Sequence, residues 1–241
     1  MTRLIAGVDG CRSGWIAVFV DADKLGVATV SMFKSFEDVF ISDAALIAVD
    51  IPIGLPDFVT RDGRGCDKAL RSRLGARQSS VFAVPAREAV MQLDYPAACA
   101  AAFARSDPPR KVSKQCFFLF PKIREVDTAL KTSSQDRVFE CHPEGAFWAM
   151  NGQQPLTEPK KVKSRPFPPG MRLRRDLLIG AGFSAQFLAS SKFRSADAGE
   201  DDFLDACACA WTAARRFRGE AIRFPPLPQV DGRGLRMEIW A

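Results

Sequence analysis

The chain has 241 residues, of which 47% are hydrophobic and 26% charged, a balance typical of a soluble globular protein. Its 19 Phe and 4 Trp side chains provide enough apolar surface to exclude intrinsic disorder. No apolar stretch is long enough to cross a membrane, and the first ten residues lack the apolar core of a signal peptide and reach an acid at Asp9. We therefore expect a cytoplasmic protein with no membrane partner.

The cysteines and the single histidine restrict the possible chemistry. The 7 cysteines include no CxxC pair, and one histidine excludes most zinc sites. We expect all of the cysteines to be reduced, as is usual in the cytoplasm. A Ser–His–Asp hydrolase would have to use His142, and the sequence contains no GxSxG motif.

The formal net charge of +6 is distributed unevenly along the chain. Residues 1–60 carry 4 basic and 8 acidic side chains, whereas residues 61–77 carry 6 and 2, and residues 105–175 carry 15 and 7. Clustered Lys and Arg favour a polyanionic partner, and nucleic acid is the one we expect. A solvated basic surface is the alternative interpretation.

Short apolar stretches separated by turns predict an antiparallel meander at the start of the chain. They cover residues 4–9, 15–21 and 27–33. Ser35 is then expected to cap a short helix, and the unbroken apolar stretch 44–50 predicts a buried fourth strand. This strand ends at IPIGLP (51–56), because two prolines and a glycine cannot continue a central strand.

Helices dominate the rest of the chain. They are expected over residues 66–74, 86–93, 96–105, 122–130, 143–152, 171–190 and 196–217. Residues 137–141 are expected to form a fifth strand, and residues 234–241 a small final one. The segment Phe117-Phe118-Phe120 is expected to be a buried strand, although its rings could stack on bases.

Three antiparallel strands followed by strands that alternate with helices indicate a mixed five-stranded α/β sheet with helices on its faces. This is the strand order of the RNase H-like fold. We expect residues 1–241 to form a single domain of this kind, in which residues 57–136 are a basic helical insertion after the fourth strand.

Acidic side chains follow two strands that this fold makes neighbours. Asp9 ends the first strand and Asp50 ends the fourth, and neighbouring strands lie about 4.8 Å apart. Asp202 and Asp205 are three residues apart on the last helix and therefore share a face. If that helix crosses the sheet edge, four carboxylates converge, and Mg²⁺ or Mn²⁺ suits such hard oxygen ligands. Two such ions could support phosphodiester hydrolysis.

Structural explanations compete with this interpretation. An Asp after a strand is often a turn residue, and acids at the start of a helix interact favourably with its dipole. Glu140 and Glu144 flank the Cys-His-Pro segment after the fifth strand, and either could complete the acidic cluster. His142 could move a proton or be a partly buried histidine with satisfied hydrogen bonds.

Seven ordered stretches that span nearly the whole chain resemble a known family. They are GVDGCRSGW (7–15), AVDIPIGLP (48–56), GRGCDKALRSRLGARQSSVFAVPAR (63–87), SKQCFFLFPKIREVD (113–127), ECHPEGAFWAMNG (140–152), DDFLDACACAWTAARR (201–216) and GLRMEIW (234–240). The sequence resembles the DUF429 family, an uncharacterised family of predicted RNase H-like nucleases. The resemblance implies an RNase H-like core and a carboxylate site at Asp9, Asp50 and the Asp202/Asp205 pair. That pair also resembles the arrangement in Holliday-junction resolvases, which often have Glu where this chain has Asp50.

Polar side chains in these motifs are candidates for binding the phosphates of a substrate, because Arg forks and Ser hydroxyls suit phosphate oxygens. The candidates are Arg12, Arg77, Ser79, Ser80, Arg87, Lys122, His142 and Glu144. Lys161, with Lys160 and Lys163, lies in a proline-rich loop at residues 153–170 and could follow a phosphate backbone or remain solvated.

The leading prediction is a divalent-metal-dependent nuclease. Asp9, Asp50, Asp202 and Asp205 would bind Mg²⁺ or Mn²⁺, and Glu140 would be a further catalytic acid. One alternative is a nucleotide-binding phosphotransfer protein of the actin and sugar-kinase type, because DGCRSGW (9–15) resembles the first phosphate loop of those proteins. They duplicate the domain, which 241 residues with one motif set do not easily accommodate. The other alternative is a catalytically inactive nucleic-acid-binding adaptor.

Overall fold

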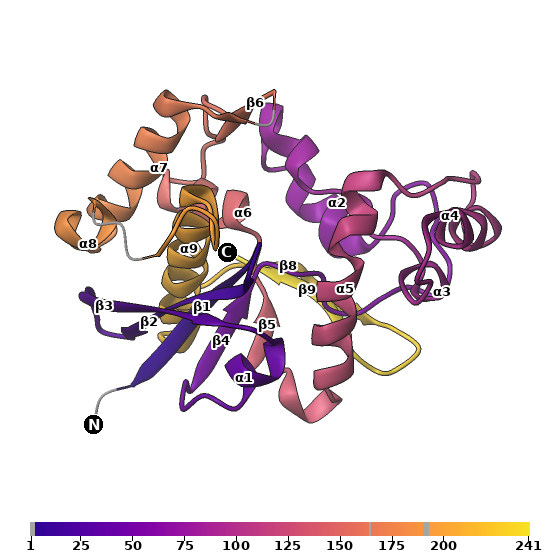
Figure 1. Cartoon of the computed structure of the whole chain (residues 1–241), viewed down its shortest axis with the longest axis horizontal. Helices are drawn as coiled ribbons and strands as arrows, with labels where there is room; N and C mark the ends of the chain where they lie inside the picture. The colour runs from indigo at the N-terminus through magenta and orange to yellow at the C-terminus, as the bar shows by residue number, and fades with distance from the viewer. Residues whose placement is uncertain (1–2, 164, 190–192) are drawn as a thin grey trace.

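The computed structural model describes residues 3–163, 165–189 and 193–241. A five-stranded sheet with the strand order β3-β2-β1-β4-β5 lies at its centre (Figure 1). The meander consists of β1 (Leu4–Cys11), β2 (Gly14–Asp21) and β3 (Lys24–Phe33), and β4 (Leu46–Val49) and β5 (Val138–Glu140) pair in parallel beside β1. The predicted fold class, three antiparallel strands followed by parallel ones with flanking helices, is confirmed.

Both faces of the central strands are buried, which explains their unbroken apolar sequences. Ile5 of β1 packs on the side of α9 (Glu200–Phe217), whereas Ala6 and Val8 belong to the core on the opposite face. Gly7 lies where α9 crosses β1, and a Cβ atom there would be 1.9 Å from the Ala210 nitrogen. Glycine is therefore required for the helix backbone to reach the sheet.

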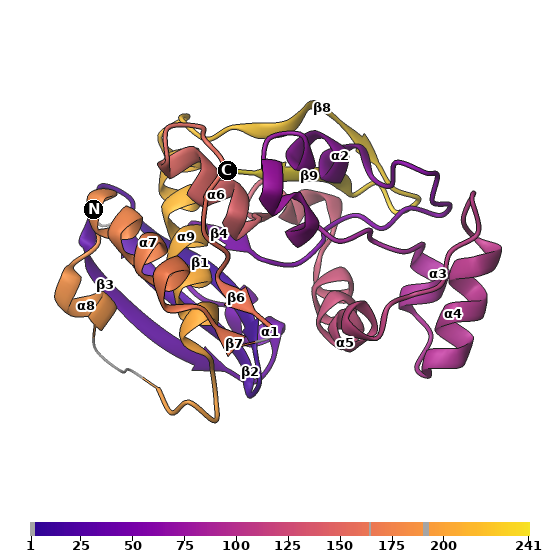
Figure 2. The same cartoon turned by 90° about the horizontal axis from the view of Figure 1, so that it is seen from above.

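Three helices lie beside α9 in the layer on its face of the sheet (Figure 2). They are α6 (Pro143–Met150), α7 (Pro168–Gly180) and α8 (Ala185–Ala189). The helix expected over residues 171–190 is thus divided into α7 and α8 near Gly180 and Gly182, and its last residue lies outside the described residues. Two antiparallel strands of two residues each precede α7. They are β6 (Lys161–Val162) and β7 (Arg165–Pro166).

The opposite face is covered by α1 (Phe36–Phe40), which Ser35 caps as expected, and by α5 (Lys114–Ala129). The expected strand at Phe117–Phe120 is wrong, because these residues lie in α5. Cys116, Phe120 and Ile123 repeat at helical spacing and are buried, whereas the side chain of Phe118 is 74% exposed. A helical period was present in the sequence, but the run of aromatic residues obscured it.

The chain between β4 and β5 is helical and contains no strand of the central sheet among its described residues. Besides α5 it contains α2 (Gly65–Arg71), η1 (Gly75–Ser80), α3 (Arg87–Val90), α4 (Tyr95–Ala104) and η2 (Thr132–Ser134). The C-terminal strands β8 (Arg223–Val230) and β9 (Arg236–Trp240) form a hairpin that packs against α2, and Trp240 bridges to Cys141 beyond β5. The expected final strand is therefore present as β9.

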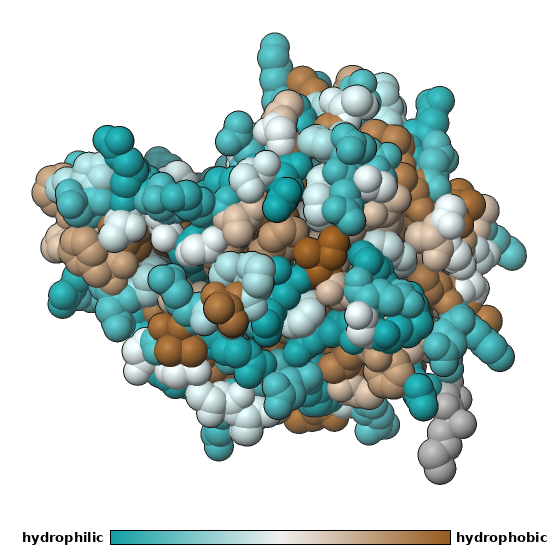
Figure 3. Space-filling model, turned by 180° about the vertical axis from the view of Figure 1, so that it is seen from behind, coloured by the Kyte–Doolittle hydropathy of each residue, from teal (hydrophilic) through white to brown (hydrophobic). Residues whose placement is uncertain are grey.

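The cysteines form no disulfide bonds, and the visible surface is mainly polar. All 7 cysteines are free and buried. Seen from behind, the surface is mainly hydrophilic with scattered apolar side chains (Figure 3). Among the described residues, no helix has the length and apolar character needed to cross a membrane.

Candidate metal site

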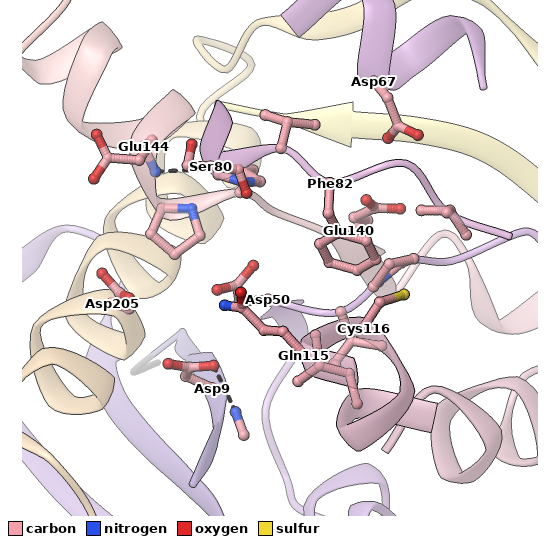
Figure 4. Close-up of a pocket in the computed structure, with 18 of the residues that line it drawn as sticks. Asp9, Asp50, Asp67, Ser80, Phe82, Gln115, Cys116, Glu140, Glu144 and Asp205 are labelled. Atoms are coloured by element: carbon pink, nitrogen blue, oxygen red, sulfur yellow. Dashed lines mark hydrogen bonds between the residues drawn. The ribbon is translucent and has the colours of Figure 1, made fainter. Parts of the chain in front are cut away.

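Three acidic side chains converge at the edge of the sheet where β4 ends. Asp9 was expected to end the first strand, but it lies inside β1, which continues to Cys11 and pairs there with β2. Oxygen atoms of Asp9, Asp50 and Asp205 lie within 4.8 Å of one another (Figure 4). Val8 pairs with Val49 in the parallel register, so that the next residue of each strand is an acid. The close crossing of α9 over β1 then brings Asp205 from its second turn to the same point. We refer to these three residues as the acidic triad.

The electrostatics of the acidic triad favour a bound cation. The residues Asp9 and Asp205 are only 8% and 1% exposed. Burial, and then the charges of Asp50 and Asp205, raise the pKa of Asp9 well above its ordinary value. Burial and the nearby Asp205 raise the pKa of Asp50 to about 8. Within the described chain, Oδ1 of Asp205 is buried without a hydrogen-bond partner. This set of hard, mutually repelling oxygens fits a divalent ion.

Lys160, in the loop before β6, already supplies one positive charge to the acidic triad. Its ammonium group forms an ion pair with Oδ2 of Asp205 and lies beside Asp9 and Asp50. Burial alone would lower the pKa of Lys160. The carboxylates of Asp205 and Asp9 have the larger combined effect, so that the pKa of Lys160 lies above its ordinary value. Three carboxylates and one ammonium leave two negative charges, which one divalent ion would balance.

The other predicted acid on α9 has a different environment. Asp202 lines the same cavity, but its Oδ2 accepts a hydrogen bond of 2.8 Å from the Gly199 backbone and so caps the helix. It is not one of the three clustered acids. Lys161 is exposed, pairs with Asp201 at 2.5 Å, and does not line the cavity.

Glu140 and Glu144 also line the cavity, but arginines hold both of them. Glu140, at the end of β5, accepts hydrogen bonds from Arg64 at 2.7 and 2.9 Å and from the Ile53 backbone at 2.7 Å. Burial raises the pKa of Glu140 to about 7, although Arg64 opposes the shift. Glu144 forms a buried ion pair with Arg174. Neither glutamate joins the acidic triad.

His142 connects the insertion to α6. Its Nδ1 accepts a hydrogen bond of 3.2 Å from the Glu144 backbone at the start of α6, and its Nε2 lies 3.4 Å from the Ser80 carbonyl oxygen. Burial lowers the pKa of His142. Both ring nitrogens therefore face backbone groups, and a neutral ring satisfies both.

The acidic triad lies in a cavity of about 370 Å³ between the sheet edge and the insertion. Of the predicted phosphate-binding residues, five line this cavity: Ser79, Ser80, Lys122, His142 and Glu144. The Lys122 ammonium donates to the Gly14 carbonyl at 2.5 Å, and its stem passes directly over Gly10.

Three predicted phosphate-binding arginines lie elsewhere. Arg12 donates to the Ser195 carbonyl at 3.0 Å. Arg87 pairs with Asp127 and Asp231 at 2.5 Å each, which connects the insertion to the C-terminal hairpin. Arg77 is half-buried in η1. None of the three lines the cavity.

Several cavity residues were missed from the sequence. Arg64 and Asp67 form a buried pair at 2.6 Å, and their i,i+3 spacing at the start of a predicted helix was an available signal. Phe82 and Gln115 lie in the matching motifs but have no distinguishing local pattern. Nothing in the sequence separates Lys160 from its neighbours Lys161 and Lys163.

These observations define the class of protein: an RNase H-like α/β fold whose sheet edge carries a buried acidic triad that could hold a metal ion. A family model described as "Protein of unknown function (DUF429)" matches residues 7–230, nearly the whole chain. The chain belongs to this family, as its motifs predicted. Comparison with the curated proteins and with the solved structures gives no match.

Proposed function

We propose that the protein is a divalent-metal-dependent phosphodiesterase that acts on nucleic acid. The observation that carries this proposal is the convergence of Asp9, Asp50 and Asp205 within 4.8 Å inside a cavity. Basic side chains at the same cavity, Lys122 and Lys160, supply positive charge for a phosphate. Carboxylates that hold a cation beside lysines that meet a phosphate form the arrangement that phosphodiester hydrolysis requires.

The three carboxylates of the acidic triad would hold Mg²⁺ or Mn²⁺. When bound, such an ion supplies a Lewis acid that polarises the phosphate group. Lys160 contributes a second cation, so we propose one divalent ion together with this ammonium group in place of two ions. Asp9 and Asp205 are buried, and their small contact with water strengthens the attraction between these charges and a bound cation.

The phosphotransfer alternative depends on the turn that joins β1 to β2. Cys11 pairs with Gly14 across a tight hairpin, and the side chain of Arg12 is turned to the Ser195 carbonyl, outside the cavity. This turn does not present an open loop to a phosphate group. The geometry therefore favours the nuclease proposal over a kinase-like one.

The decisive experiment compares the wild type with Asp9→Asn on labelled oligonucleotides, with Mn²⁺, with Mg²⁺ and with EDTA. We expect metal-dependent cleavage that falls by about a hundredfold or more in the variant, together with loss of Mn²⁺ binding by calorimetry. Asp201→Asn, on the same helix but outside the acidic triad, is the matched control and should stay within about twofold. Equal cleavage by the wild type and Asp9→Asn would refute the proposal. Metal-independent, salt-sensitive binding without cleavage would favour the adaptor.

A further inference from the structure

The cavity has two chemically different walls (Figure 4). One is the acidic triad with Asp202 and Lys160. The other is formed by residues 79–84 and 113–119 of the insertion, whose cavity-lining side chains are uncharged and include Phe82, Leu119 and Gln115. The insertion also contributes the charged side chains of Arg64, Asp67 and Lys122 to the cavity. A site that bound only phosphates would not need these uncharged side chains beside its carboxylates.

We propose that this wall receives one unpaired nucleobase, so that the substrate of the acidic triad is an unstacked nucleotide, either free or within a single strand. This inference rests on the proposed function and names the substrate class of the same site. In this arrangement the base lies against the ring of Phe82, and the amide of Gln115 contacts the edge of the base.

The size of the cavity supports a single nucleotide. A volume of about 370 Å³ falls within the range of roughly 300–1,000 Å³ typical of sites for one small molecule. Because Asp9 and Asp205 are 8% and 1% exposed, a phosphate has to enter the cavity to reach them. An intact duplex keeps its bases paired and stacked, so a base can reach the insertion wall only from an unpaired strand or a free nucleotide.

The side chains on the insertion wall match the chemistry of a base. Phe82 is half-buried and offers an aromatic face, on which any base can stack. Gln115 is exposed, extends from α5 into the cavity, and has no hydrogen-bond partner among the described residues. A glutamine amide both donates and accepts, as the edges of unstacked bases require.

A second hollow continues the cavity beyond Phe82. It measures about 180 Å³ and shares Phe82, Val84, Ser113 and Cys116 with the first. Arg110 and Lys111, both exposed, line it as well. These cations suit the phosphate of a neighbouring nucleotide, so the two adjoining hollows can accommodate a continuing strand as well as a free nucleotide.

The first test measures kcat/KM with Mn²⁺ on a single-stranded oligonucleotide, on the same sequence as a blunt duplex, and on a nucleoside 5′-(p-nitrophenyl) phosphate. We expect the single strand to be cleaved at least about tenfold faster than the duplex. Cleavage of the nitrophenyl ester alone assigns the site to free nucleotides, and cleavage of the strand assigns it to nucleic acid. Cleavage of both the single strand and the duplex at equal rates would overturn the inference.

The second test changes the insertion wall. Phe82→Ala should lower kcat/KM on the preferred substrate by about 5- to 150-fold, the range that corresponds to the loss of one stacked base. Phe82→Leu keeps the apolar volume and should show part of this loss, and Gln115→Leu should change the preference among the four nucleotides. Phe118→Ala, on the outer side of α5, is the matched control and should leave the rate unchanged. Unchanged kinetics in all the wall variants would refute the role of this wall.

A binding measurement separates this inference from the proposed function. In the Asp9→Asn background, a single strand with one 2-aminopurine should change its fluorescence on binding, and adding Phe82→Ala should abolish the change. Persistence of the change with Phe82→Ala would overturn the inference even if cleavage is confirmed. If no Asp9-dependent cleavage exists but the fluorescence change depends on Phe82, the proposed function fails and the base site stands.

Discussion

The two walls of the cavity differ in how they are held. The acidic triad belongs to β1, α9 and the end of β4, where the strand register and the helix crossing at Gly7 position the backbone. The insertion wall includes loop and helix-end residues, and Ser79, Ser80 and Gln115 are exposed. The reacting groups thus lie on the rigid sheet core, whereas the groups expected to choose the substrate lie on more exposed segments.

A buried arginine holds the two walls together. Arg64, at the start of the insertion, pairs with Asp67 at 2.6 Å and with Glu140 of β5 at 2.7 Å. It also donates to the Ile53 carbonyl at 3.0 Å. The insertion is therefore attached to the sheet by a charge network inside the protein, and the comparison of the two walls can be tested by breaking this connection.

The largest change in stability is expected for Arg64→Met. Removing Arg64 leaves the carboxylates of Asp67 and Glu140 buried without their partner, which should lower the free energy of unfolding by about 3–5 kcal/mol. Urea denaturation measures this loss. Lys68→Met is the control, because Lys68 and Asp62 are 63% and 59% exposed and such a pair contributes about 0–1 kcal/mol. Equal effects of both changes would show that the network does not join the walls.

The carboxylate wall itself should break with Gly7→Ala. The new methyl group would be 1.9 Å from the Ala210 nitrogen and 2.2 Å from the Ala206 carbonyl oxygen, so α9 has to move away from the sheet. We expect a loss of about 1–3 kcal/mol or more, with weaker Mn²⁺ binding because Asp205 moves with the helix. Gly180→Ala in α7 meets no atom within 4 Å and should be neutral or slightly stabilising. Wild-type stability and Mn²⁺ binding in Gly7→Ala would contradict the close crossing.

Metal-free stability should depend on pH through Asp50. Its pKa is raised from its ordinary 3.8 to about 8, so between these values the folded chain binds more protons than the unfolded one. The free energy of unfolding should therefore fall as the pH rises from about 4 to about 8. In Asp50→Asn this part of the fall disappears, and Tm at about pH 8 should exceed that of the wild type by roughly 2–4 °C or more.

The control for this pH effect is Asp43→Asn, which changes an exposed carboxylate far from the acidic triad in the fold. It should keep the wild-type slope of Tm against pH. The same slope in Asp50→Asn would mean that the acidic triad imposes no cost on the metal-free protein.

The smallest effect is expected for Lys160→Met. Without its ammonium, the buried Asp205 loses its partner, so metal-free Tm should fall. A divalent ion would then compensate a larger unbalanced charge, and the rise in Tm on adding Mn²⁺ should exceed that of the wild type by a few degrees. Lys161→Met, which removes the pair with Asp201 outside the cavity, should leave the Mn²⁺-induced rise unchanged. An unaltered rise in Lys160→Met would exclude Lys160 as the second cation.

Local sequence patterns were sufficient to predict the sheet and the positions of Asp9 and Asp50 in the acidic triad. Strand periodicity and turn residues located β1 to β5, and strand order then made Asp9 and Asp50 neighbours. Asp205 could be predicted because it lies among small apolar residues on a long amphipathic helix. The patterns failed at Phe117–Phe120, where burial on one side of α5 could not be distinguished from a strand by composition.

The sequence by itself determined the residues that lie on or next to core strands and helices. A buried strand and a packed helix each have a periodic pattern of apolar residues that can be recognised in the sequence. The tertiary structure alone decided that Lys160, and not Lys161, forms an ion pair with the acidic triad. It also decided that Arg64 pairs with Glu140, and that Phe82 and Gln115 line the same cavity as the carboxylates. The physical reason is the separation along the chain of the residues that each signal involves. Hydrophobic periodicity is a property of neighbouring residues, whereas these contacts join segments tens of residues apart, and their geometry exists only after the chain has packed.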